Sequence, residues 1–222
     1  MSSGAGEPRP FLSEADRVAG VVRDQIVTGV RASGSRLVER DLAAELGVSR
    51  IPVRDALRTL VGEGLVTPRP HTWAVVRTFT ATDVEDLMEV RAALETLAFR
   101  RAAVLRTADQ LTALHAYVAE EHRAARAGDA VAARRAGAAF HEAVVAAAGN
   151  ALLSELFATT RSRMLWLLGQ HTALTEMADE HAALAQAVGD QDADRAEELA
   201  LAHLVMSRDA ALEQLQTVGA TT

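Results

Sequence analysis

The sequence predicts a mainly α-helical fold in two parts, a small N-terminal unit with short strands and a longer unit made only of helices. Apolar residues recur at helical spacing through most of the chain, which is typical of amphipathic helices. Strand-like runs occur only before residue 80, and glycines separate the helical stretches after it. We therefore expect a disordered tail (1–10), a first domain (11–78), a linker (79–81) and an all-helical domain (82–222).

The composition fits a globular protein, because 49% of the 222 residues are hydrophobic and 24% are charged. The chain has no cysteine, which excludes disulfides and thiolate zinc sites. Met1 to Pro10 lacks the apolar core of a signal peptide, and no apolar run is long enough to span a membrane. We expect a cytoplasmic protein without a membrane partner.

The net charge of -7 at first argues against a nucleic-acid partner. The charge is unevenly distributed, however. Residues 1–80 hold 11 arginines and 9 acidic residues, a balance of +2, whereas the rest holds 12 arginines and 21 acidic residues, a balance of -9. A basic face on the first unit, joined to an acidic second unit, is compatible with DNA binding, because the local field matters more than the total.

The first unit should contain three helices and a small sheet. Helical spacing spans residues 12–29, a short strand is expected at 36–38, and a second helix at 39–46. A third helix follows and ends near Gly62 and Gly64. Two further strand candidates, 65–67 and 73–76, flank a turn at 68–72. Helices followed by a small hairpin predict a winged helix-turn-helix.

The third helix of this unit is the candidate for DNA recognition. Gly47 suits the left-handed end of the preceding helix, Ser49 is a favourable N-cap, and Pro52 falls in the first turn, where it removes no needed donor. One face of the helix is an apolar stripe, formed by Val53, Ala56, Leu57 and Leu60. The adjacent face bears three arginines four residues apart, Arg50, Arg54 and Arg58. Arginine neutralises phosphate and can bind guanine in the major groove. The alternative, a solvated arginine face on an ordinary amphipathic helix, leaves the agreement of cap, turn and stripe unexplained.

The second unit should contain six helices. A capping box of Thr82 and Glu85 predicts the start of a long helix that ends near residue 107. Its buried side is expected to hold Val84, Leu87, Leu94, Leu97 and Val104. The five further helices are expected at residues 108–127, 129–148, 151–170, 175–188 and 191–218.

Residues 12–77 resemble the DNA-binding domain of the GntR family of bacterial transcription regulators. The matching residues are Arg40-Asp41-Leu42-Ala43, Leu46-Gly47-Val48-Ser49-Arg50, Pro52-Val53-Arg54-Asp55-Ala56-Leu57, Leu60 and Glu63-Gly64-Leu65-Val66. The resemblance implies that DNA is contacted by Arg40, Ser49, Arg50, Arg54 and Arg58, and by the wing residues Arg69 and His71. The wing departs from the family pattern, because the usual arginine-glycine tip is replaced by Arg69-Pro70-His71-Thr72.

The second unit resembles the FCD ligand-sensing domain of the FadR-type subfamily, and its six-helix count is similar to the VanR-like branch. The matching residues are Val90-Arg91, Leu94-Glu95, Phe140-His141, Gly149-Asn150, Glu180-His181, Gly189-Asp190 and His203. The resemblance implies a homodimer that responds to a small carboxylate effector. We expect four residues at the effector site, Arg91, Glu95, Arg134 and Asn150, of which Arg134 is not among the matching residues.

Three histidines among apolar neighbours form the candidate sensor site, His141, His181 and His203. A single buried histidine is most often a hydrogen-bonded core residue, but three imidazoles from three helices suit a divalent metal such as zinc or nickel. The spacing cannot show convergence, which the FCD resemblance implies. Gly137 stands where metal-binding members carry an aspartate, so we expect a weakened site. In the alternative, the metal is lost and the histidines bind an anion directly together with Arg91.

Arg91 and Glu95 lie four residues apart on one predicted helix. They could form an exposed ion pair, or Arg91 could reach the carboxylate of the effector, as the resemblance implies. Arg134 lies seven residues before His141 and could add charge to the same site.

These observations predict a ligand-responsive, dimeric transcription regulator, most often a repressor in this family, that binds a double-stranded DNA operator. The alternative is a helical metalloenzyme with a three-histidine zinc site. That alternative leaves the three arginines of the recognition helix without a role, and the sequence contains no HExxH, GxSxG or phosphate-loop motif. A regulator that senses the metal itself is a third possibility, which Gly137 makes less attractive.

Overall fold

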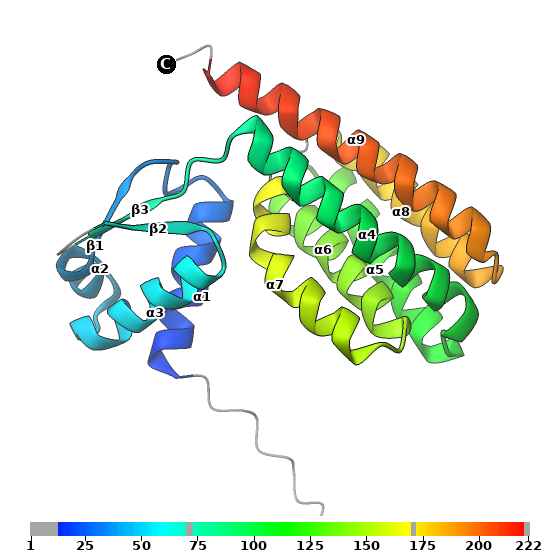
Figure 1. Ribbon diagram of the computed structural model, residues 1–222, viewed down its shortest axis with the longest axis horizontal. Helices are drawn as coiled ribbons and strands as arrows, with labels where there is room; N and C mark the ends of the chain where they lie inside the picture. The colour runs from blue at the N-terminus through cyan, green and yellow to red at the C-terminus, as the bar shows by residue number, and fades with distance from the viewer. Residues whose placement is uncertain (1–12, 70–72, 170–171, 220–222) are drawn as a thin grey trace, which may run out of the picture. The chain divides into compact units, whose positions relative to one another are not determined.

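A computed structural model of the chain describes residues 13–69, 73–169 and 172–219 (Figure 1). The chain divides into two compact units, residues 1–77 and 78–222. The predicted disordered tail at residues 1–10 lies outside the described residues, as does the wing tip at 70–72. Within the described residues, no helix combines the length and the apolar character needed to cross a membrane.

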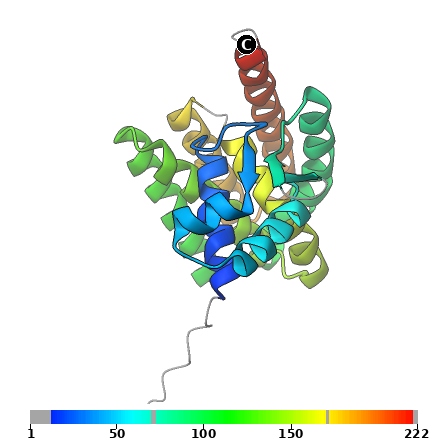
Figure 2. The same ribbon diagram turned by 90° about the vertical axis from the view of Figure 1, so that its left-hand side faces the viewer.

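The first unit is a winged helix-turn-helix, seen in blue and cyan in Figure 2. Its described elements are α1 (Glu14–Val27), β1 (Arg36–Val38), α2 (Glu39–Leu46), α3 (Arg50–Gly62), β2 (Val66–Arg69) and β3 (Trp73–Val76). The strands form one antiparallel sheet with β3 in the middle, where Val75 pairs with Arg36 on one side and with Thr67 on the other. The predicted fold class, a mainly α protein with this unit followed by a helical bundle, is confirmed.

The core of the first unit fixes the recognition helix. Helix α1 packs against α3, and both contribute fully buried valines, Val18 and Val22 from α1 and Val53 from α3. Gly47 ends α2 in the left-handed conformation, with φ of 67°, as the sequence predicts. Ser49 occupies the N-cap position of α3 as predicted. The expected capping hydrogen bond is not formed, because the Ser49 side chain accepts no hydrogen bond from a backbone amide of the helix. The hydroxyl of Ser49 thus stays available to a ligand at the start of α3.

The described residues of the second unit form six helices. They are α4 (Ala81–Leu105), α5 (Ala108–Arg126), α6 (Ala130–Ala147), α7 (Ala151–Leu168), α8 (Leu174–Gly189) and α9 (Ala193–Gly219). Their ends differ from the predicted ends by at most two residues. Helix α4 packs along α9, and α5 packs against α6 and α8 (Figure 1). The largest buried apolar side chains of this core include Phe99, Leu114, Phe140, Met164 and Leu184.

The start of α4 corrects one prediction. The capping box consists of Thr80 and Asp83, rather than Thr82 and Glu85, so that α4 begins at Ala81. The sequence contains two overlapping pairs of a threonine with an acidic residue three positions later, and the earlier pair forms the cap, with Thr80 in the extended conformation. The preceding residue, Phe79, is buried and stacks on Trp166 of α7 with 4.0 Å between ring centroids.

The buried face of α4 also differs from the prediction. Val84 and Leu87 are buried as expected and Leu94 is partly buried, but Leu97 and Val104 are exposed to 44% and 60%. The face that enters the core is turned by about one residue, since it continues through Arg91, Glu95, Ala98 and Ala102. Two charged residues take core positions on this helix, and the apolar pattern alone could not reveal that.

Candidate functional site

The arginines of α3 form an exposed basic face. Arg50, Arg54 and Arg58 are all exposed to solvent, on the face of the helix next to the buried stripe. Arg40 on α2 and Arg69 on β2 are exposed as well. The predicted contact residue His71 lies outside the described residues. An exposed arginine face on a helix supported from behind by a core can enter the major groove of DNA.

Glu39, at the start of α2, organises this basic face and was not anticipated from the sequence. Arg54 donates through Nε and Nη2 to the two oxygens of Glu39, both at 2.9 Å, and Arg50 Nη2 donates to Oε2 at 3.3 Å. The hydrogen bond from Arg54 is the main reason why the pKa of Glu39 is lowered. The carboxylate therefore holds Arg50 and Arg54 in position. A DNA phosphate that binds either arginine would have to compete with Glu39.

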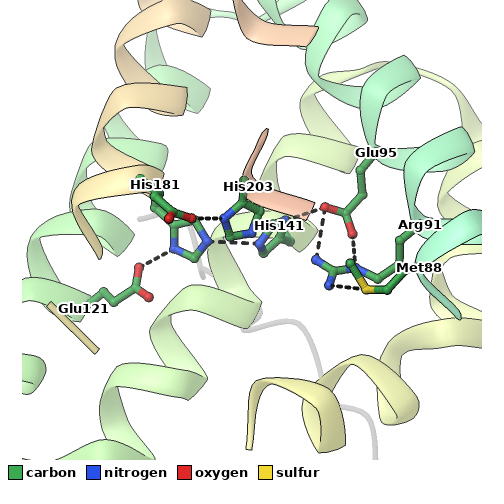
Figure 3. Close-up of polar contacts among 8 residues, drawn as sticks. Met88, Arg91, Glu95, Glu121, His141, His181 and His203 are labelled. Atoms are coloured by element: carbon green, nitrogen blue, oxygen red, sulfur yellow. Dashed lines mark hydrogen bonds and ion pairs between the residues drawn. The ribbon is translucent and has the colours of Figure 1, made fainter. Parts of the chain in front are cut away.

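The second unit encloses a cluster of three histidines. His141 comes from α6, His181 from α8 and His203 from α9, and all three are at least 98% buried. One ring nitrogen of each lies within 4.8 Å of those of the other two, and the Nε2 atoms of His141 and His181 are 3.1 Å apart (Figure 3). The structure thus brings together the three residues that the sequence singles out.

Each histidine of the cluster is paired with one glutamate through its Nδ1 atom. A carboxylate at this position favours the proton on Nδ1, which directs the lone pair of Nε2 away from the glutamate. The distances from Nδ1 to the carboxylate oxygen are 3.0 Å for His141 with Glu95, 2.6 Å for His181 with Glu121, and 2.7 Å for His203 with Glu180. This arrangement is typical of histidines that bind a metal through their second nitrogen.

Sequence reasoning assigned no role to Glu121 or Glu180. For Glu121 a signal was available, because it continues the buried stripe of α5 through Leu114 and Val118 at spacings of four and three. A carboxylate on an apolar stripe requires a buried partner. Glu180 was noted only as part of the Glu180-His181 match to the FCD domain, and its side chain, 30% exposed, lies on no buried stripe that could have predicted a partner.

Arg91 and Glu95 form a buried ion pair, which excludes the alternative of an exposed pair. Arg91 donates through Nε to Oε1 at 2.6 Å and through Nη2 to Oε2 at 3.3 Å, and its Nη1 lies 3.7 Å from the sulfur of Met88. Burial raises the pKa of Glu95, but the charge of Arg91 and the contacts with Arg91 and His141 outweigh it and hold the pKa at about 2. Burial also lowers the pKa of His141, which favours its neutral form.

The other predicted site residues have the following positions. Asn150 caps α7, because its Oδ1 accepts a hydrogen bond from the backbone amide of Leu153 at 3.2 Å. Arg134 is partly buried on α6, and desolvation lowers its pKa. Gly137 is buried beside the cluster, where a Cβ atom would lie 2.7 Å from Glu121 Oε1. The effector roles of Asn150, Arg134 and Arg91 stay predictions.

Two family models match the chain. Residues 14–74 match the gntR family of bacterial regulatory proteins, and residues 86–206 match the FCD domain. The second match alone covers more than half of the chain. The VanR-like branch stays a prediction, because these matches do not distinguish branches of the family.

Relatives agree with this assignment. The "Probable D-xylose utilization operon transcriptional repressor" of Paenarthrobacter nicotinovorans is 32% identical over 197 residues, which are 85% of each chain. The "Nta operon transcriptional regulator" of Aminobacter aminovorans is 30% identical over 197 residues, 85% of this chain and 89% of that protein.

Among solved structures, E. coli McbR/YncC has the same fold. It superimposes with a TM-score of 0.79 at 23% identity and covers 92% of this chain and 99% of its own. The matched relatives are transcription regulators, which contradicts the alternative of a helical metalloenzyme. The chain therefore belongs to the GntR family of bacterial transcription regulators, with an FCD domain as its second unit, and it is a DNA-binding regulator rather than an enzyme.

Proposed function

We propose that this regulator is a homodimeric repressor whose helical unit senses a small organic acid through a divalent metal held by His141, His181 and His203. The observation that carries the proposal is the buried histidine cluster in which a glutamate occupies each Nδ1 position. Three imidazole nitrogens arranged in this way are a donor set that zinc or nickel prefers, so the residues present fit the metal.

The charges around the cluster favour a cation over an anion as the direct ligand of the histidines. Arg91 and Glu95 neutralise each other through their two hydrogen bonds. Glu121 and Glu180 then add two carboxylates beside imidazoles of which at least His141 is held neutral. A divalent cation would balance these charges, whereas a carboxylate placed directly on the histidines would be repelled. The alternative of a metal-free anion pocket is therefore the weaker one.

A bound divalent ion would supply a positive charge to which the carboxylate of an effector can bind. The chain itself positions the three ring nitrogens, because each glutamate fixes the tautomer and orientation of one histidine. Arg91 lies next to the cluster, on the side of His141 and beyond Glu95 (Figure 3). An effector carboxylate that reaches Arg91 would compete with Glu95 for the guanidinium.

On the DNA side, we propose that α3 enters the major groove and that Arg50, Arg54 and Arg58 contact phosphates and base edges. Two copies of the chain would bind successive half-sites of one operator, as symmetric helix-turn-helix dimers do. Effector binding that changes the spacing of the two first units would change operator affinity, and operator binding would change effector affinity by the same factor. The operator of a bacterial gene lies in the cytoplasm, where we expect the chain to work.

The test is the metal content of protein purified without a chelator or a histidine tag. We expect about one zinc or nickel per chain in the wild type and in the control variant His115→Ala, since His115 is exposed on α5. The variant His181→Ala should lose the metal because one of three ligands is removed. A wild-type chain that holds no metal, and takes up none from a zinc solution, would refute the metal part of the proposal and leave DNA binding untouched.

A further inference from the structure

Gly137 on α6 lies one helical turn before His141. The backbone conformation at this position does not require glycine. Gly137 is buried inside the helix, and it is not among the glycines with positive φ. What a side chain would meet is Glu121, since a Cβ atom would lie 2.7 Å from Glu121 Oε1, so that this carboxylate would have to shift, and 3.2 Å from His181 Cε1. The glycine thus leaves room for a carboxylate that comes from another helix.

Glu121 fills that room from α5. Glu121 is only 2% exposed, and its Oε2 lies 2.6 Å from Nδ1 of His181. The ring of Phe140 packs against His181 with 4.9 Å between centroids. A side chain at position 137 would push on Oε1 of the carboxylate whose Oε2 pairs with His181, and in this buried place no solvent would compensate for a weakened hydrogen bond.

We propose that Glu121 supplies the carboxylate expected from an aspartate at position 137, and that Gly137 is the space this exchange requires. Glu121 is a positioning residue, because it acts on the metal through His181. It keeps the proton on Nδ1 and directs Nε2 of His181 toward His141. The inference rests on the proposed metal site. It removes the reason to expect that Gly137 weakens this site, because a carboxylate is retained next to a metal-binding histidine, although not as a ligand of the ion itself.

The first experiment measures zinc affinity by competition with a chromogenic chelator. Glu121→Gln should lower the affinity about 10- to 100-fold, as the loss of a partner to a metal-binding histidine does. The matched control is Glu120→Gln, which changes the neighbouring residue of α5, partly exposed and paired with Arg123 instead. Wild-type affinity in Glu121→Gln would overturn the role of Glu121 while the metal site itself stands.

The second experiment tests the pairing of Gly137 with Glu121 without any metal. Gly137→Ala is made in the wild type and in Glu121→Ala, and the urea midpoint of each protein is measured in the presence of a chelator. The midpoint should fall in the wild-type background, because the new methyl displaces Glu121 from His181. It should stay equal or rise in the Glu121→Ala background, because alanine is the better helix former.

The outcomes separate the two proposals. An equal effect of Gly137→Ala in both backgrounds would overturn the pairing, whether or not zinc binds. A wild-type chain without zinc affinity would overturn the metal site and with it the role of Glu121 toward the ion, and the unfolding experiment would still decide whether Gly137 exists to accommodate Glu121.

Discussion

The buried ion pair on α4 allows a quantitative prediction for the variant Arg91→Met. Methionine retains the unbranched shape of the arginine stem, so the main loss is the guanidinium that donates to Glu95 at 2.6 and 3.3 Å. Both side chains are almost fully buried, with exposed fractions of 0% and 2%. Removing one partner of such a pair costs about 3–5 kcal/mol of unfolding free energy, because the other charge stays buried without compensation.

The pKa of Glu95 gives a magnitude of the same order. Burial raises this pKa, and Arg91 and His141 lower it from 4.5 to about 2. This lowering of the pKa corresponds to about 3 kcal/mol of unfolding free energy. In the variant, the part of this stabilisation that comes from His141 remains. Because the pKa is depressed in the folded state, the stabilisation is complete above pH 4.5 and is lost as the pH falls toward 2. The measurement therefore belongs at pH 7.

The assay is urea unfolding followed by circular dichroism, with a chelator present so that metal binding does not contribute. The control is Arg195→Met on α9, where the pair with Glu198 is exposed and should contribute less than about 1 kcal/mol. In the double variant Arg91→Met, Glu95→Leu part of the loss should return, because no carboxylate is left buried without its guanidinium, and the remainder reflects the loss of the carboxylate 3.0 Å from Nδ1 of His141. An Arg91→Met chain as stable as Arg195→Met would refute the reasoning.

Two further predictions concern the DNA-binding unit. Arg54→Ala should abolish specific operator binding without changing the unfolding midpoint, and its residual binding should show a salt slope smaller by about 1, because one phosphate-neutralising arginine is gone. Unchanged operator affinity in gel-shift titrations would rule out α3 as the recognition helix. Glu39→Gln should raise the affinity for random-sequence DNA several-fold, since the carboxylate no longer competes with phosphate for Arg50 and Arg54. Equal affinity of variant and wild type for such DNA, measured by fluorescence anisotropy, would show that Glu39 only orients the two arginines.

The elements of the fold were predictable because their signals are local. Glycine at helix ends, alternation of apolar and polar residues, and N-cap residues act within a few positions of the chain. The error at the start of α4 is instructive, because Thr80 and Thr82 offer the same local signal. The choice between them is made by Phe79, whose ring stacks on a residue 87 positions later in the sequence.

The candidate site was predictable only in part. The three histidines were singled out by their apolar neighbours, but their convergence was implied only by the family resemblance, because spacing along the chain cannot show that three helices converge. Their partners Glu121 and Glu180 come from α5 and α8, and the link between Glu121 and Gly137 exists only in three dimensions. The burial of Arg91 and Glu95 was left open, because the apolar pattern of α4 cannot show that charged residues take core positions, and that pattern placed Leu97 and Val104 in the core instead.

The polar cluster joins more of the second unit than its small size suggests. Its histidines come from α6, α8 and α9, and their glutamates from α4, α5 and α8, so that five of the six described helices meet at one point. Local opening of any one of these helices must break a buried polar contact. Amide hydrogens in all five should therefore exchange with solvent as one cooperative group, whereas α7, which contributes no member of the cluster, can open separately.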